Sequence, residues 1–339
     1  DGEATGGLRA QMQAELKHKL ERSAKTGEPL RVYYGADPTR KSLHIGHMVP
    51  IVHLRKFQRL GHQVTFLIGD YTALIGDPSG QSTERTQLTA AEVKAMSEFY
   101  TGQAHRLLHA DTREVVYPDG SVIEFCAEVV RNSSWLSKLS FSDIIELAAQ
   151  FPLAQVTARN SFRERMESGA GVRLHECLYM LMQGYDAYAL NCDLQVGGYD
   201  QHFNLLAGRI LQKYFAEKLK NSGSHFRYIA KPVRGPHVML TYPLLMGTDG
   251  RKMSKSWGNT IDVLDPPEEM YGKLMRISDE MITHYIDTAV EATQAEKDEW
   301  KARAETEPLA AKKWVAAQIT EMYNSTEAAL EAAGEAATG

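Results

Sequence analysis

A strand, helix and strand pattern near the amino terminus constrains the fold of this chain more than any other feature. Residues 31–37 predict a buried strand, and residues 63–69 predict a second one in which apolar positions alternate. Between them, Ser42 is a plausible N-cap for a helix over residues 44–60, with Gly61 as its terminator. A unit this short predicts parallel strands whose faces are covered by helices.

The rest of the chain continues this alternation and then becomes entirely helical. A turn at Tyr117–Gly120 predicts a hairpin, and only helices are expected beyond Leu264. The alanine- and glutamate-rich terminus after Ser325 is expected to fray. The sequence therefore predicts an α/β fold, a Rossmann-like doubly wound parallel sheet, followed by an all-helical C-terminal domain. The further helices are expected at 8–23, 90–108, 134–168, 174–190 and 200–215, and the further strands at 193–197 and 238–245.

Composition and charge exclude several classes of protein. The hydrophobic fraction of 43% and the charged fraction of 24% are ordinary for a globular protein, and no apolar run approaches the length of a membrane span. Cys126, Cys177 and Cys192 are odd in number and irregularly spaced, which argues against a disulfide framework or a zinc site and favours a reducing compartment. The formal charge of −5 gives no general attraction to nucleic acid. The amino terminus resembles neither a secretory signal nor a transit peptide, so the protein is expected in the cytoplasm, away from membranes.

His44 and His47 form the first motif with chemical meaning. They follow the predicted strand that ends at Asp37 and lie three residues apart at the start of the predicted helix. Backbone N–H groups and the positive end of the helix dipole attract a phosphate there, and Gly46 lets a nucleotide approach the backbone. Surface or metal-binding histidines are the alternative, but no third ligand follows at a suitable spacing, so a metal site is the poorer interpretation.

The second motif is Lys252-Met253-Ser254-Lys255-Ser256, about two hundred residues further along the chain. Glycines flank this basic loop on both sides and permit it to close. A loop of this composition is usually only solvated surface. When it accompanies the histidine motif, however, two flexible ammonium groups can stabilise the charge that develops on a leaving pyrophosphate. We therefore expect both motifs to act on the triphosphate of ATP.

A third group of residues lies on one face of a predicted helix. Tyr179, Gln183 and Asp186 are spaced i, i+4 and i+7, and their neighbours are mostly apolar. Polar groups in a buried helix need partners, so a structural hydrogen-bond network is one explanation. The functional interpretation is a pocket wall that offers hydrogen bonds to a polar small molecule.

The turn over residues 195–201 joins a predicted strand to a predicted helix. Gly197 and Gly198 permit a ligand to approach the backbone, and Asp200 at the helix start can accept hydrogen bonds from ribose hydroxyl groups. Most glycine pairs of this kind are merely turns. At the carboxyl end of a parallel strand, however, a ligand crevice is expected.

The histidine and lysine motifs together resemble the signature of the class I aminoacyl-tRNA synthetases. Within that class, the chain is similar to the tyrosyl-tRNA synthetases of the bacterial and organellar type from about Val32 to Ile282. The blocks that carry this resemblance are Tyr33–Thr39, Gly76–Gly80, Tyr179–Asp186 and Gln195–Gln201.

The resemblance implies a domain organisation. The expected parts are a Rossmann-like catalytic domain over 1–245 with a helical insertion at about 130–170, a lysine loop and linker over 246–262, and an α-helical tRNA-binding domain over 263–339. A further C-terminal RNA-binding domain is expected to be absent from this chain. Homodimerisation is implied through the helices around Ser134–Glu167.

The resemblance also assigns roles to individual residues. It implies that Tyr33 and Asp186 bind the phenolic hydroxyl group of tyrosine. The residues implied to bind the rest of tyrosine are Asp77, Tyr179, Gln183 and Gln201. The residues implied to bind ATP and the adenylate are Gly35, Asp37, Gly46, Gln195, Gly198, Asp200, Lys252, Met253 and Lys255. The residues implied to be catalytic are Thr39, His44, His47, Lys252 and Lys255.

The implied reaction has two steps. Tyrosine and ATP give tyrosyl-adenylate and pyrophosphate, and the tyrosyl group then passes to the 3′ end of tRNA(Tyr). ATP is a substrate, Mg²⁺ accompanies ATP and pyrophosphate, and no metal held by protein ligands is expected. Because a carboxylate is already a nucleophile, positioning and charge stabilisation suffice for the first step.

Three other functions are alternatives. A tryptophanyl-tRNA synthetase shares the fold and both motifs, but Asp186 with Tyr33 argues against it because an indole offers one donor and no acceptor. A catalytically silent RNA-binding relative is disfavoured because His44, His47 and Lys252 are intact. A small nucleotidylyltransferase is disfavoured by the five-residue lysine motif and the helical C-terminal domain.

Overall fold

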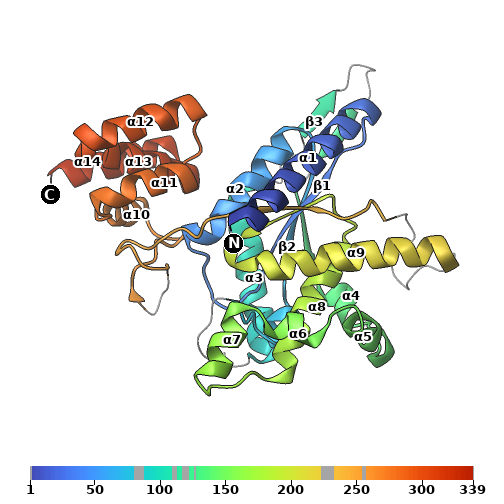
Figure 1. Ribbon diagram of the computed structural model, residues 1–339. Helices are drawn as coiled ribbons and strands as arrows, with labels where there is room; N and C mark the ends of the chain where they lie inside the picture. Colours follow the sequence, from blue (N-terminus) through green and yellow to red (C-terminus); the bar gives the residue numbers. More distant parts are fainter. Residues whose placement is uncertain are drawn as a thin grey trace. The chain divides into compact units, whose positions relative to one another are not determined.

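The computed structural model describes residues 2–79, 88–108, 113–116, 122–125, 127–222, 233–253 and 257–338. The chain divides into two compact units (Figure 1). The first unit comprises residues 1–39, 54–101 and 109–241, and the second comprises residues 40–53, 102–108 and 242–339. The second unit thus combines the C-terminal region with two segments from the region expected to be catalytic.

The first unit is built on a five-stranded sheet with the order β5-β2-β1-β6-β7. β1 is parallel to β2 on one side and to β6 on the other, and β2 is parallel to β5. The prediction of a parallel sheet is confirmed. The strands are β1 (Arg31–Ala36), β2 (Gln63–Ile68), β5 (Glu128–Arg131), β6 (Leu194–Gly198) and β7 (Val238–Tyr242).

The strand order changes direction at β1. The chain passes from β1 to β2 and β5 on one side, and later adds β6 and β7 on the other. Open parallel sheets bind ligands beyond the carboxyl ends of the strands at such a point. Asp37 follows β1 and Gly198 ends β6, so two residues predicted for the site lie there.

Helices accompany the sheet, as the buried strands require. Five of the six residues of β2 are buried, which is typical of a strand covered on both faces. α8 and α9 pack against each other, and Gly184 permits their close approach, because an added Cβ would lie 3.1 Å from the backbone of Ala207. The helices that lie wholly in this unit are α1 (Gly2–Thr26), η1 (Thr72–Leu74), α4 (Ser133–Leu136), α5 (Phe141–Ala148), α6 (Leu153–Thr157), α7 (Asn160–Glu167), α8 (Leu174–Ala189), η2 (Tyr199–Gln201) and α9 (His202–Ser222).

Two helices continue from one unit into the other. α2 (Ile45–Arg59) begins in the second unit and ends in the first, and α3 (Ala90–Leu107) begins in the first and ends in the second. Gly61 follows α2 with φ +83°, which confirms the predicted terminator. The predicted N-cap is wrong, because α2 begins only at Ile45 and the hydroxyl of Ser42 donates to Asp262 Oδ2 at 2.9 Å.

The predicted hairpin is confirmed as a two-stranded antiparallel sheet. β3 (Arg113–Val116) pairs with β4 (Val122–Phe125), while the expected turn residues between them lie outside the described part of the chain.

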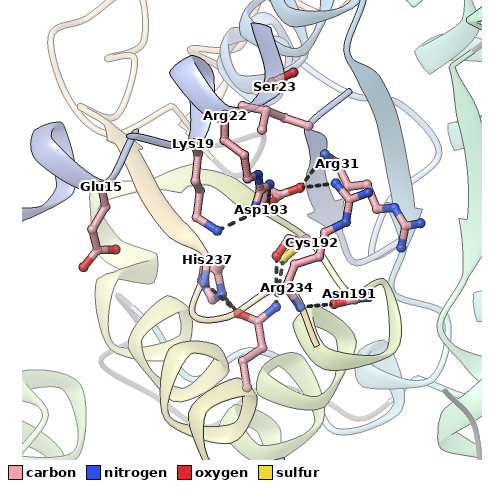
Figure 2. A network of polar contacts seen from close by, with 12 residues as sticks. Glu15, Lys19, Arg22, Ser23, Arg31, Asn191, Cys192, Asp193, Arg234 and His237 are labelled. Atoms are coloured by element: carbon pink, nitrogen blue, oxygen red, sulfur yellow. Dashed lines mark hydrogen bonds and ion pairs between the residues drawn. The ribbon is translucent and has the colours of Figure 1, made fainter. Parts of the chain in front are cut away.

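A buried carboxylate anchors α1 to the sheet (Figure 2). Asp193, immediately before β6, is fully buried and binds Lys19 at 3.3 Å and Arg22 at 2.9 Å, both on α1. Arg234 reaches its other oxygen at 2.9 Å, and the N–H of Arg31 donates to the same oxygen at 3.1 Å. Segments from four places in the sequence therefore meet at one side chain.

The second unit contains a bundle of helices, as the sequence predicts. α10 packs against α13 and α14, and α12 packs against α13 (Figure 1). The prediction that the terminus after Ser325 frays is wrong, because α14 buries Ala329 and Ala332. No helix in the described ranges is both long and apolar enough to cross a membrane. The bundle helices are α10 (Pro267–Met275), η4 (Asp279–Met281), α11 (Ile282–Thr288), α12 (Gln294–Thr306), α13 (Pro308–Tyr323) and α14 (Thr326–Thr338).

Candidate active site

Asp37 lies at the carboxyl end of β1, and two hydroxyl groups hold its carboxylate. Thr72 donates to Oδ1 at 2.7 Å, and the phenol of Tyr179 on α8 donates to Oδ2 at 3.0 Å. The backbone passes close by at Gly69, where a Cβ atom would lie 2.1 Å from Asp37 Oδ1, so this position requires glycine. The predicted residues Asp37 and Tyr179 are thus in contact, and Thr72 and Gly69 are residues that sequence reasoning missed.

Asp186 is the centre of a second network on α8. It is 2% exposed and accepts hydrogen bonds from Trp135 Nε1 at 2.7 Å and from Asn132 Nδ2 at 3.1 Å. Burial raises the pKa of Asp186 to about 8, although both donors oppose this shift by stabilising the carboxylate. Asn132 also donates to Thr72 Oγ1 at 3.0 Å. The networks around Asp186 and Asp37 are therefore joined through side chains that sequence reasoning did not identify.

Three predicted residues of the first unit carry a buried side-chain polar atom that makes no hydrogen bond within the described part of the chain. These atoms are the hydroxyl of Tyr33 and the amide oxygens of Gln183 and Gln195. Tyr33 and Gln195 are direct neighbours across β1 and β6. Burial raises the pKa of Tyr33 well above its ordinary value, and the charges of Cys192 and Asp186 add to this shift. Buried polar groups without partners are costly, so such a group of atoms indicates where a polar ligand completes the hydrogen bonding.

Asp77 lies in the loop that follows η1 and is held from the segment after β6. Gln201 Nε2 donates to Asp77 Oδ2 at 2.6 Å, and Asn204 Nδ2 lies 3.3 Å from Oδ1. The backbone N–H of Ser79 donates to the same Oδ1 at 2.9 Å. Two residues predicted for the tyrosine site, Asp77 and Gln201, are therefore in contact.

The remaining predicted residues of this unit lie along β1 and β6 and just after them. Tyr34, which is buried in β1, responds to two of the predicted carboxylates. Its pKa is raised by burial first, then by Tyr100, and then by the charges of Asp200 and Asp37. The others are Gly35 within β1, Thr39 two residues after Asp37, and Gly198 at the end of β6.

A cavity of about 310 Å³ lies at the other, amino end of the strands. Tyr33 and Trp135 line it, so it borders the Asp186 network. None of the other predicted site residues lines this cavity. The candidate chemistry therefore belongs to the carboxyl ends of the strands.

In the second unit, His44 and His47 lie at the start of α2. Their ring centroids are 3.7 Å apart, and the backbone N–H of His47 donates to the carbonyl of His44 at 2.9 Å. An ideal Cβ on Gly46 would lie 3.0 Å from His44 Nδ1, so glycine leaves room for this ring. The two imidazoles are therefore brought together at a helix start, where a phosphate is favoured.

The segment that holds the histidines is hydrogen-bonded to the segment after the lysine loop. The N–H of Ile45 donates to the carbonyl of Ile261 at 2.9 Å, and the N–H of Val263 donates to the carbonyl of Leu43 at 2.9 Å. Both motifs therefore belong to the same compact unit.

Lys252 stands at the base of its loop with an exposed side chain. Its carbonyl accepts a hydrogen bond from Asn259 Nδ2 at 3.2 Å, and Asn259 also donates to Asp249 Oδ1 at 2.7 Å. Met253, predicted for the ATP site, is buried at 4% exposure. Lys255 lies outside the described residues.

The two units present different kinds of chemical group. The first presents carboxylates and unpaired hydroxyl and amide groups, which suit an ammonium group and a phenol. The second presents a helix start, two imidazoles and an ammonium group, which suit phosphates.

Comparison with known proteins agrees with this chemistry. Residues 25–338 match the sequence model of the family "tRNA synthetases class I (W and Y)". The tyrosine--tRNA ligase of Geobacter metallireducens is 40% identical over 322 residues, which are 94% of this chain and 72% of that protein. The tyrosine--tRNA ligase of Symbiobacterium thermophilum is 42% identical over 316 residues, which are 92% of this chain and 70% of that protein.

A solved structure shows the same fold. The C-terminally truncated mitochondrial tyrosyl-tRNA synthetase of Aspergillus nidulans superposes with a TM-score of 0.69 at 23% identity. The match covers 91% of this chain and 85% of that one. The predicted Rossmann-like α/β fold is therefore confirmed.

Proposed function

The chain belongs to the class I tRNA synthetases for tryptophan and tyrosine, and we propose how its residues perform the reaction of a tyrosine--tRNA ligase. Relatives that are about 40% identical over most of the chain are tyrosine--tRNA ligases, and the activity of this chain is theirs. The structural observation that carries the residue assignment is the buried Asp186. Its charge acts on Tyr33, whose buried hydroxyl makes no hydrogen bond among the described residues.

Tyr33 and Asp186 recognise the phenolic hydroxyl group of the substrate. In the ionised form of Asp186, each carboxylate oxygen accepts one hydrogen bond from Trp135 or Asn132, which leaves lone pairs for the substrate. The hydroxyl of Tyr33 supplies a donor. Phenylalanine leaves both groups unpaired, and this penalty is the physical basis of discrimination. An indole N–H satisfies Asp186 alone, which disfavours tryptophan.

Asp77 binds the ammonium group of tyrosine, together with Tyr179 and Gln183. The carboxylate of Asp77 is already oriented by Gln201 and by the N–H of Ser79, so little reorganisation accompanies binding. The amide oxygen of Gln183, which makes no hydrogen bond within the described ranges, provides a second acceptor for the same group.

His44, His47 and Lys252 act on the triphosphate, which enters as its Mg²⁺ complex. The tyrosine carboxylate attacks the α-phosphate, the bond to the bridging oxygen breaks, and pyrophosphate leaves with that electron pair. The imidazoles and the ammonium group stabilise the charge on the phosphates as it develops, and Lys255 is proposed to assist. No general base is required, because the carboxylate attacks in its ionised form.

The second step transfers the tyrosyl group to the terminal adenosine of tRNA, and residues 263–339 are proposed to contact the RNA. This region contains 16 acidic and seven basic residues, so its general charge repels RNA. RNA contacts must therefore come from local groups such as Lys313, whose side chain is exposed on α13.

A second copy of the chain is the proposed partner of the helical segment α5–α8. Large apolar side chains are exposed there, which is unusual for a monomer surface. They are Phe141 at 80%, Ile145 at 57%, Leu153 at 67%, Met166 at 47% and Leu174 at 79%. The cytoplasm is the proposed compartment, since Cys177 and Cys192 are both free thiols.

Exchange of labelled pyrophosphate into ATP tests the proposal. We expect exchange that depends on tyrosine, stays at background with tryptophan, and is far weaker with phenylalanine. Tryptophan-dependent exchange, or none with tyrosine, would refute the residue assignment and the activity together.

A further inference from the structure

Arg159 is a buried cation that the proposed reaction does not use. It is 8% exposed, and its Nη2 donates a hydrogen bond to the hydroxyl oxygen of Ser79 at 2.6 Å. Its guanidinium group lies 4.9 Å from the ring centroid of Phe162 and 5.2 Å from that of Phe203. Its Nη1 atom has no hydrogen-bond partner within the described ranges. Buried guanidinium groups usually pair with a carboxylate, so this arrangement requires an explanation.

Arg165, six residues further along, shows the usual arrangement. It is 1% exposed, and both of its terminal nitrogens donate to the carboxylate of Glu176, with 2.9 Å between Nη2 and Oε1. Such a bidentate pair satisfies both charges and joins α7 to α8. Within the described residues, Arg159 has no carboxylate partner, and its Nη2 donates to Ser79 in the loop after η1 instead.

Ser79 connects Arg159 to Asp77. The hydroxyl of Ser79 also accepts a hydrogen bond from Asn204 Nδ2 at 3.2 Å, and its N–H donates to Asp77 Oδ1. Asn204, which is fully buried, directs the same Nδ2 toward Asp77 Oδ1 at 3.3 Å. A shift of Ser79 therefore moves the groups that orient Asp77.

The charge of Arg159 also acts on Asp77. Burial lowers the pKa of Arg159, and the negative charge of Asp77 partly restores it. Position and charge therefore both link Arg159 to this carboxylate.

We propose that Arg159 is a positioning residue for the amino-acid substrate: it fixes Ser79, and through Ser79 and Asn204 it orients the carboxylate of Asp77 toward the substrate ammonium group. This inference rests on the role proposed above for Asp77. It concerns the ammonium group alone, so ATP binding should not depend on it.

The test compares the variants Arg159→Met, Arg159→Lys and Ser79→Ala, and the double variant Ser79→Ala/Arg159→Met, in tyrosine-dependent pyrophosphate exchange. We expect Arg159→Met to raise the KM for tyrosine about 10- to 30-fold, as expected for the loss of a hydrogen bond from a charged group, with kcat and the KM for ATP nearly unchanged. Arg159→Lys keeps the positive charge and should raise the KM for tyrosine only about threefold. Because Arg159 and Ser79 act through one contact, the KM for tyrosine of the double variant should not exceed that of the more impaired single variant.

Arg165→Lys is the matched control. It alters a buried arginine of α7, the helix that begins directly after Arg159, and should lower Tm without changing the KM for tyrosine. An unchanged KM for tyrosine in the Arg159 variants, additive effects in the double variant, or an equal rise in the KM for ATP would overturn the proposal. If Arg159→Met does not fold, Ser79→Ala/Arg159→Lys takes the place of the double variant in the same test. Failure of the proposed function is distinct, because the unaltered protein would then show no tyrosine-dependent exchange.

Discussion

The two units hold their functional side chains in different ways. In the first unit, Asp37, Asp77 and Asp186 each accept at least two hydrogen bonds from neighbouring groups. In the second unit, the side chain of Lys252 is exposed and that of His47 is partly exposed. Fixed acceptors suit the selection of one amino acid, whereas more exposed nitrogen groups suit charge that appears only during reaction. Changes in the first unit should therefore alter binding, and changes in the second should alter rate.

Lys252→Ala should have the largest effect. We expect kcat for adenylate formation to fall about 10²- to 10³-fold, the usual cost of removing one group that stabilises transition-state charge, while the KM for tyrosine stays within about twofold. Rapid-quench measurement of the first turnover separates the two constants. Lys313→Ala, at an exposed lysine of α13, is the control and should change neither. If Lys252→Ala weakened the affinity for tyrosine and left the rate of adenylate formation unaltered, the proposed division between binding in the first unit and rate in the second would be wrong.

The pH dependence of stability should reveal the cost of burying Asp186. Its pKa is about 8 in the folded protein and near 4 when unfolded, so the folded state binds the extra proton between these values. Stability should therefore fall as pH rises from about 4 to about 8, by at most ~1.4 kcal/mol per pH unit from this residue.

Urea unfolding at several pH values measures this slope. Asp186→Asn should flatten it, since the variant has no proton to lose there. Asp249 in the second unit behaves oppositely, because the hydrogen bond from Asn259 is the main cause that lowers its pKa to about 2. Its contribution to stability therefore increases as pH rises to about 5 and adds almost no slope above that value. If stability depended equally on pH in Asp186→Asn and in the unaltered protein, the raised pKa of Asp186 would be contradicted.

Tyr33→Phe should have the smallest effect. We expect the preference for tyrosine over phenylalanine to fall about tenfold, because one hydrogen bond of about 1 to 1.5 kcal/mol is lost. The ratio of the kcat/KM values for tyrosine and phenylalanine in pyrophosphate exchange measures this preference. Tyr323→Phe, at a buried tyrosine of the helical bundle, should leave the ratio unchanged. A preserved ratio in Tyr33→Phe would remove this residue from the recognition of the phenol.

Elements with a clear local period could be predicted from the sequence. The helix expected at 174–190 is observed as α8, and the strand expected at 31–37 is observed as β1. Predictions were wrong where a contact with a residue far away in the sequence determines the local structure. Ser42 forms no cap because its partner Asp262 lies 220 residues away in sequence.

The same reason explains the residues missed at the candidate site. Trp135 and Asn132 bind Asp186 from 51 and 54 residues away, and no period links them. One signal was present for Asn132, which directly follows β5 as Asp37 directly follows β1. A search for polar residues directly after parallel strands could therefore have identified Asn132. The contact between Arg159 and Ser79, in contrast, corresponds to no pattern in the sequence.

The anchoring of α1 by Asp193 has a consequence for synthesis on the ribosome. Lys19 and Arg22 precede their partner by 174 and 171 residues, so α1 is made long before the carboxylate that binds it. At the usual pace of translation, about 5 to 20 residues per second, the helix waits roughly 10 to 35 s. During that interval the cationic side chains of α1 are available to chaperones and to polyanions. Docking of α1 is therefore a late event in the maturation of the nascent chain.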